Sequence, residues 1–273
     1  MVTNNASLRR RYGDAAALPE IVENETIDGL LSHRSVRAYL PLPLPSGALP
    51  TLIAAAQSAA TSSNLQAWSV VAVEDADRKR ELAVLAGDQE HIGECPLFLV
   101  WLADLSRLGR IAERRALPFE AVAYTEALLL ATIDAALAAQ NAAVAAESLG
   151  LGTVYIGGMR NRPLDVAAAL NLPQHVFAVF GMCVGWPDTA RPASIKPRLP
   201  QTAVLHRESY ATAGEEHDVA AYNAAMAVFY DEQQMHVQGD WATHSARRMA
   251  GDQSLSGRHT LRAALERLGF PQR

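Results

Sequence analysis

The sequence predicts an α+β fold built from layers of helices and strands. Helical patterns outnumber strand patterns along the 273 residues, and the strands are scattered instead of alternating with helices as βαβ units. One segment, from about residue 120 to residue 149, is rich in alanine and leucine and shows almost no polar face. The hydrophobic content of 49% is sufficient for a substantial core. These observations together indicate layers of helices and strands, with one long helix that is buried inside its own fold or against a partner.

Helices are predicted where apolar residues recur every three or four positions. These segments cover residues 25–32, 48–60, 78–85, 120–149, 163–170 and, with breaks near Gly239 and Gly251, 218–267. Ser46 is a suitable N-cap for the helix that follows it. Gly150 stands where a glycine would end the long helix. Capping residues and periodicity therefore agree on these boundaries.

Strands are predicted where short apolar runs are bounded by turn residues. These runs cover residues 68–73, 96–102, 153–156 and 176–184. The run at 96–102 is apolar without alternation, which is typical of a strand buried on both faces of a sheet. Four prolines between residues 40 and 50 make that stretch a connector, and residues 188–205 are also proline-rich and extended.

The chain is expected to divide into an N-terminal arm at 1–24, a core at 25–205 and a helical extension at 206–273 that packs on the core. A helix of roughly 30 residues is about 45 Å long. Burying such a helix all round is easier between two subunits than inside one chain of this size. A homodimer is therefore expected.

Composition excludes several classes of protein. The net charge of -5 and the pI of about 5.9 argue against general binding of nucleic acid, which needs a basic face. Cys95 and Cys183 are the only cysteines and form no CxxC motif, so neither a zinc site nor a disulfide framework is expected. The N-terminus lacks the apolar core of a signal peptide. Polar residues interrupt the long apolar segment too often for a membrane span. A soluble cytoplasmic protein is expected.

Two short basic segments indicate a bound dianion, most simply a phosphate. His33-Arg34-Ser35-Val36-Arg37 and Ile195-Lys196-Pro197-Arg198 each place two cations within five residues. Arginine can meet phosphate oxygens with both arms of its guanidinium group. Capping of a helix C-terminus is the alternative for Arg34 and Arg37. The sequence has neither a G-x-G-x-x-G nor a P-loop motif, so side chains would have to hold the phosphate.

Three further segments have the composition to surround a flat heterocycle and its sugar chain. They are the loop with Ser62, Ser63, Asn64 and Gln66, the turn Tyr155-Ile156-Gly157-Gly158, and Gln89. The alternative for the polar loop and for the glycine segment is an ordinary turn, and the alternative for Gln89 is a solvated side chain. No motif of a metal-dependent or nucleophilic hydrolase is present. The chemistry is therefore expected to come from a bound cofactor, without a metal.

In their order along the chain, these segments resemble the FMN-dependent nitroreductases, most closely the oxygen-insensitive NADPH nitroreductase and NADPH–flavin oxidoreductase subgroup. The resemblance covers His33 to Pro200 and includes Gly87-Asp88-Gln89 and the run from Ala139 to Gly152. It implies a mixed or antiparallel sheet flanked by helices, with the long helix in a dimer core and FMN at the subunit interface. It also implies ping-pong turnover, in which NAD(P)H reduces the flavin at N5 and a nitroaromatic, a quinone or free flavin then takes two electrons. No protein side chain is expected to carry the chemistry.

The same resemblance implies a role for each candidate residue. The FMN phosphate would be held by His33, Ser35, Arg37 and Arg198, and Arg34 and Lys196 would neutralise negative charge on the phosphate or the reduced flavin. Ser62, Ser63, Asn64 and Gln66 would line the ribityl chain and ring. The polar edge of the ring would face Gln89 and the backbone of Tyr155, Ile156, Gly157 and Gly158.

The electron donor is less well defined by the resemblance. NADPH-specific members carry arginines in the loop that corresponds to residues 231–240, and this loop has none. Arg247 and Arg258 lie further on, where the C-terminal extension is expected to approach the NAD(P)H or substrate site. NADPH and NADH both remain open. Two other functions also remain open, namely a flavin-binding protein without nicotinamide turnover and a specialised flavin oxidase.

Overall fold

The computed structural model describes residues 5–13, 18, 20–270 and 273, and the chain forms two compact units. The sheet unit comprises Ser35–Pro192 and Ser256–Arg273, and the helical unit comprises Met1–Arg34 and Ala193–Leu255. Each unit combines segments that are distant in the sequence, whereas the sequence predicted three contiguous parts.

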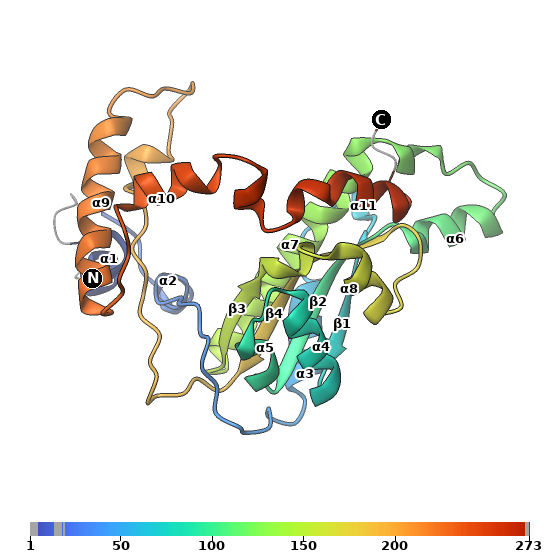
Figure 1. Ribbon diagram of the computed structural model, residues 1–273, viewed down its shortest axis with the longest axis horizontal. Coiled ribbons are helices and arrows are strands. Elements are labelled where there is room, and N and C mark those ends of the chain that lie inside the picture. Colours follow the sequence, from blue (N-terminus) through green and yellow to red (C-terminus); the bar gives the residue numbers. More distant parts are fainter. Residues whose placement is uncertain (1–4, 14–17, 19, 271–272) are drawn as a thin grey trace. The chain divides into compact units, whose positions relative to one another are not determined.

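Within the described residues, the sheet has four antiparallel strands in the order β1-β2-β4-β3 (Figure 1). The strands are β1 (Trp68–Val73), β2 (Leu97–Asp104), β3 (Gly152–Ile156) and β4 (Val176–Gly185). Every residue of β2 is buried, which confirms the prediction of a strand covered on both faces. The α+β class is confirmed, and the four predicted strands differ from the observed ones by two residues at most.

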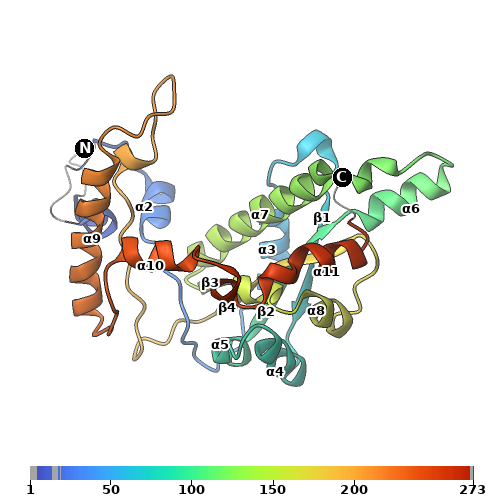
Figure 2. The same cartoon turned by 45° about the horizontal axis from the view of Figure 1, so that its top comes forward.

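Helices cover both faces of this sheet (Figures 1 and 2). One face carries α3 (Ala48–Gln57) and α7 (Thr125–Ser148), and the other carries α4 (Ala76–Leu85), α5 (Glu90–Glu94) and α8 (Pro163–Ala169). The unit also contains α6 (Ser106–Arg114), α11 (Leu261–Arg267) and short 3-10 turns at Ser62–Asn64, Glu120–Ala123, Gly157–Arg160 and Arg258–Thr260.

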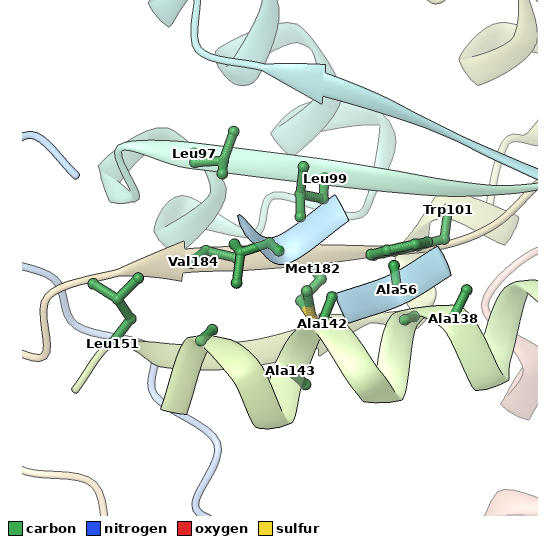
Figure 3. Close-up of a cluster of buried hydrophobic side chains, with 13 residues drawn as sticks. Ala56, Leu97, Leu99, Trp101, Ala138, Ala142, Ala143, Leu151, Met182 and Val184 are labelled. Carbon is green, nitrogen blue, oxygen red and sulfur yellow. The ribbon is translucent and has the colours of Figure 1, made fainter. Parts of the chain in front are cut away.

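The main core lies between the sheet and α7 (Figure 3). Because alternate residues of a strand point to the same face, Leu97, Leu99 and Trp101 of β2 all reach this core. They meet Ala138 and Ala142 of α7, which are fully buried. The small alanine side chains let the helix approach the strands closely, so the unusual composition of α7 reflects its packing on the sheet.

The opposite side of α7 remains apolar and exposed in a single chain. Leu129, Ile133 and Leu137 are spaced one helical turn apart and are 52%, 56% and 43% exposed. Length and composition alone would allow α7 to cross a membrane, but here it covers the sheet. We call Leu129, Ile133 and Leu137 the outer stripe of α7.

Several predicted boundaries are wrong for local reasons. The long helix begins at Thr125 instead of residue 120, because Tyr124 is extended with ψ at 145°. Gly47, with φ at 82°, takes the N-cap position expected for Ser46. The helix expected from residue 78 begins at Ala76, because the Asp75 side chain accepts the backbone N–H of Arg78. Gly150 does follow the end of α7 with φ at 79°, as predicted.

The helical unit contains α1 (Asn5–Tyr12), α2 (Glu25–Leu31), α9 (Glu215–Glu232) and α10 (Trp241–Arg248), with 3-10 turns at Gln201–Ala203 and Asp252–Leu255. Its own small core is formed by Tyr222, Met226 and Phe229 of α9. Trp241 packs against this core with its ring edge-on to Tyr222.

Candidate functional site

A pocket of about 350 Å³ opens in the sheet unit where β3 ends. It is bounded by the turn after β3 and by the connection from α4 to α5. Of the residues predicted from the sequence, the pocket is lined by Arg37, Gln89, Tyr155, Ile156, Gly157, Gly158 and Arg258. Residues from four distant parts of the chain thus meet in one place.

Position 158 must be a glycine because the backbone there packs directly against another segment of the chain. A Cβ atom at this position would lie 2.2 Å from the carbonyl oxygen of Ala86, at the end of α4. At Gly157 the nearest atom to such a Cβ would be Nη2 of Arg160, at 3.5 Å. The sequence suggested that both glycines let the backbone approach a ring. For Gly158 the close neighbour is Ala86.

Guanidinium groups make this region of the pocket electropositive. Arg258 donates from Nε to Oδ1 of Asn161 at 2.8 Å, and Asn161 donates from Nδ2 to the carbonyl oxygen of Ala86 at 3.2 Å. Arg160 donates to the carbonyl oxygen of Val179. Burial and then the charge of Arg258 lower the pKa of Arg160. With Arg37 also lining the pocket, the site suits an anionic group.

His91 also lines this pocket, although it was not among the residues predicted from the sequence. Burial and then the charge of Arg37 lower its pKa, so the imidazole is neutral near pH 7. Within the described part of the chain its Nε2 atom is buried without a hydrogen-bond partner. Its position two residues after Gln89 could have identified His91 as a pocket residue, because both residues belong to the same short segment.

The polar loop at 61–66 does not line this pocket and is anchored to α7 instead. Asp134 of α7 is 1% exposed and accepts three hydrogen bonds. Its Oδ2 accepts from Thr61 Oγ1 at 2.6 Å and from the N–H of Ala67 at 3.0 Å, and its Oδ1 accepts from the N–H of Ser62 at 3.1 Å. Asp134 therefore fixes both ends of the loop. In the sequence, Asp134 is one of the polar residues that interrupt the long apolar segment, and its role as an anchor was not predicted.

The same loop has an unusual backbone conformation. Ser63, Asn64 and Gln66 have φ values of 48°, 55° and 50°, in the left-handed region that favours glycine. Non-glycine residues in this region cost conformational free energy and cluster at functional sites. The loop thus presents three polar side chains from a strained backbone.

The first basic segment is divided between the two units, and the second lies wholly in the helical unit. Ser35 and Arg37 belong to the sheet unit, where Ser35 forms a bridge with Thr153 of β3. His33, Arg34, Lys196 and Arg198 belong to the helical unit. Arg34 donates to the carbonyl oxygen of Ser32 at 3.4 Å, close to the end of α2, which agrees with the capping alternative for this residue.

Within the helical unit, the structure brings the segments around His33 and Lys196 together. Arg11 of α1 donates to the carbonyl oxygens of Leu31, His33 and Lys196. The ammonium group of Lys196 lies 5.8 Å from the centre of the Phe229 ring. No role was predicted for the N-terminal arm that contains Arg11. Its run of three arginines was the only signal.

The two arginines predicted for NAD(P)H lie in different units. Arg258 lines the pocket of the sheet unit, whereas Arg247 is exposed in the last turn of α10. In the loop at 231–240, the carboxylate of Asp240 accepts the N–H of Thr243 at 2.8 Å. This acid therefore caps α10.

Comparisons with known proteins find matches over most of the chain. A model described as "Nitroreductase family" matches residues 30–90 and 83–186, and one described as "Nitroreductase family, C-terminal domain" matches residues 196–273. The FMN reductase (NADPH) of Bacillus subtilis is 42% identical over 212 residues, which cover 77% of this chain and 84% of the relative. The oxygen-insensitive NADPH nitroreductase of Salmonella typhimurium is 38% identical over 223 residues, or 81% and 90% of the two chains.

A solved structure shows the same fold. The structure of NfrA2 from B. megaterium superposes with a TM-score of 0.86 at 38% identity and covers 92% of this chain and 100% of that one.

Proposed function

The chain belongs to the nitroreductase family and is an FMN-dependent NAD(P)H oxidoreductase, and we propose that its pocket at the end of β3 forms one wall of the FMN site. One observation carries this proposal, namely that Arg37, Gln89 and the turn at 155–158 line a single pocket. Their chemistry fits FMN. A guanidinium group suits an anion, a primary amide suits the imide edge of a flavin ring, and a glycine turn allows close approach.

Bound FMN supplies two-electron redox chemistry. The residues of the chain bind the cofactor and set the charge around it. Arg37 and Arg258 keep positive charge at the pocket, which favours an anionic group. Tyr155 stays protonated because burial and then the charge of Glu147 raise its pKa. His91 is neutral near pH 7 and adds no charge.

The protein is further proposed to be a homodimer in which the loop at 61–66 of one subunit completes the FMN site of the other. The four predicted cofactor residues of this loop do not line the pocket of their own chain. Asp134 anchors the loop to α7, and the adjacent Ile133 belongs to the outer stripe of that helix. A stripe of large apolar side chains is unfavourable in water, and contact with a second α7 would bury it.

Small electron acceptors, namely nitroaromatics, quinones or free flavin, are the proposed substrates of the second half-reaction. The site features are shared by nitroreductases and by flavin reductases that deliver reduced FMN. Arg258 at the pocket favours a charged donor, and NADPH and NADH are both retained as candidates. The cytoplasm is the proposed location, since Cys95 and Cys183 are both buried free thiols.

The proposal is tested by an anaerobic absorbance titration of the FMN-loaded protein with NADPH and, separately, with NADH. Bleaching of the flavin band by either donor is the expected result, and the donor that bleaches at lower concentration is the preferred one. Release of reduced FMN during turnover would indicate a flavin reductase, whereas tightly held FMN with turnover of nitro compounds would indicate a nitroreductase. Bound flavin that neither donor bleaches would instead support a flavin-binding protein or an oxidase.

A further inference from the structure

The N-terminal helix α1 lies outside both family matches, which begin at residues 30 and 196. It is nevertheless packed within the helical unit. Leu8 is 1% exposed, and a Cβ on Gly13 would lie 3.0 Å from the Cβ of Ala225 in α9. The helix therefore has an ordered place in the fold, and its last turn carries the charged residue of interest.

Arg11 is a buried cation that donates hydrogen bonds to main-chain carbonyl oxygens on two different segments. It is 7% exposed. One terminal nitrogen, Nη2, donates to Leu31 at 2.6 Å and to His33 at 2.9 Å. The other, Nη1, donates to Lys196 at 3.1 Å. In the reverse direction, the N–H of Arg198 donates to the carbonyl oxygen of Arg11 at 2.7 Å.

These contacts fix the two segments relative to each other. A guanidinium group is planar, and its donors have a rigid geometry, so carbonyl groups that share it are held at fixed separations. A buried charge is tolerated only when its hydrogen bonds are made. Displacing either segment would leave part of this charge unsatisfied. Arg11 therefore constrains residues 31–33 and 196–198 together.

The constrained segments carry residues that were predicted to bind the FMN phosphate or to neutralise its charge. His33 lies on the first, and Lys196 and Arg198 lie on the second. All three are phosphate or charge-neutralising candidates in the FMN assignment. We propose that Arg11 is a positioning residue for the FMN phosphate, which holds these two segments in register without itself contacting the cofactor. The inference rests on the proposed FMN site and adds to it a role for the N-terminal arm.

The test compares FMN with riboflavin, which lacks the phosphate. Apoprotein of the full chain is titrated with each flavin, and quenching of flavin fluorescence gives the two dissociation constants. The variants are Arg11→Gln, Arg11→Lys and, as a matched control, Arg10→Gln, which changes an exposed arginine of the same helix. Melting temperatures of the apoproteins are measured alongside.

We expect the wild type and Arg10→Gln to bind FMN more tightly than riboflavin. In Arg11→Gln this preference should fall by about tenfold, which is the lower end of the loss found when a residue that orients a metal ligand is removed. Riboflavin affinity should change little. Arg11→Lys keeps the charge but loses the planar fork, and an intermediate preference is expected.

Three outcomes overturn the inference. A lower melting temperature in both Arg11 variants with an unchanged FMN preference would make the residue purely structural. Equal changes in Arg10→Gln and Arg11→Gln would make the effect one of general charge. Equal affinity of the wild type for both flavins would show that the phosphate adds nothing to binding, so that Arg11 would have no phosphate site to position. Failure of the wild type to bind FMN at all would instead contradict the proposed function. If Arg11→Gln does not fold, the comparison is made with Arg11→Lys.

Discussion

Gly158 and Ala86 meet at the level of the backbone, with no room for even a methyl group between them. A Cβ on Gly158 would lie 2.2 Å from the carbonyl oxygen of Ala86. This contact joins the turn after β3 to the end of α4, and both segments line the pocket. The shape of the pocket therefore depends on the absence of one side chain.

Gly158→Ala is expected to destabilise the fold by about 1–3 kcal/mol, as overpacking of a tight contact usually does. FMN affinity should fall as well, because the turn must move away from Ala86. Thermal unfolding and flavin titration measure the two effects. Gly157→Ala is the control for stability, since its added Cβ would make only an ordinary contact with Arg160. An equal loss of stability in the two variants would contradict this explanation.

Arg37→Ala should raise the FMN dissociation constant. Loss of one charge-assisted hydrogen bond corresponds to about 1.5–3 kcal/mol. The control is Arg262→Ala, which removes an exposed ion pair with Glu266 on α11. Unchanged FMN affinity in Arg37→Ala would remove Arg37 from the site.

The Thr61 hydroxyl group connects Asp134 to Gln66 at the far end of the polar loop. Its Oγ1 donates to Asp134 and accepts the N–H of Gln66 at 2.9 Å. Thr61→Val has the same shape without the hydroxyl group, and FMN affinity should fall as the loop loosens. The buried carboxylate loses a donor, so about 1–3 kcal/mol of stability should be lost too. Thr61→Ser should retain both properties, and a serine variant as weak as the valine variant would argue against this connection.

Ile133→Glu is expected to convert the proposed dimer to monomers, because an unpaired carboxylate would be buried between its two α7 helices at a cost of about 3 kcal/mol or more. Sedimentation velocity measures the assembly state. Ile111→Glu on α6 is the matched control, since Ile111 is 42% exposed but lies outside the outer stripe. A wild-type protein that sediments as a monomer would contradict the dimer, and so would an Ile133→Glu variant that remains dimeric.

The lowered pKa of His91 predicts a loss of stability in mild acid. The unfolded chain binds this proton more readily than the folded one. The contribution to stability is therefore complete above the unfolded pKa of about 6.5 and is lost as the pH falls toward the lower folded value. The melting temperature should fall between about pH 7 and pH 5. It should fall less in His91→Gln, whereas His259→Gln at an exposed position should follow the wild type.

Some of this pH dependence should persist in His91→Gln. Burial also lowers the pKa of His175, which packs edge-on against Phe119 and Phe270. If His91→Gln kept the full pH dependence of the wild-type melting temperature, His91 would not contribute to that dependence.

Local signals in the sequence were sufficient for the strands and for much of the pocket. The apolar run that forms β2 and the glycine turn after β3 were both recognisable from a few adjacent residues. The five-residue helix α5 was missed because so short a segment carries little periodicity. The charged helix α6 was missed as well.

Sequence patterns could not predict contacts between residues that are distant in the chain. Nothing near Asp134 reveals that its partners are Thr61 and Ala67, and nothing near Arg11 reveals Lys196. The strand order, in which β4 lies between β2 and β3, is likewise decided by pairing across long separations. The buried polar groups that organise the candidate site are therefore the part that required the structure.

The left-handed residues Ser63, Asn64 and Gln66 have a consequence for how this protein would respond to selection for heat resistance. Glycine at any of these positions would relieve a strain of about 1 kcal/mol or more but would remove a hydroxyl or amide group. A screen for thermal tolerance alone should therefore enrich glycine in this loop. If the loop completes the FMN site as proposed, the survivors should bind the cofactor poorly, and stability and activity are opposed at these three positions.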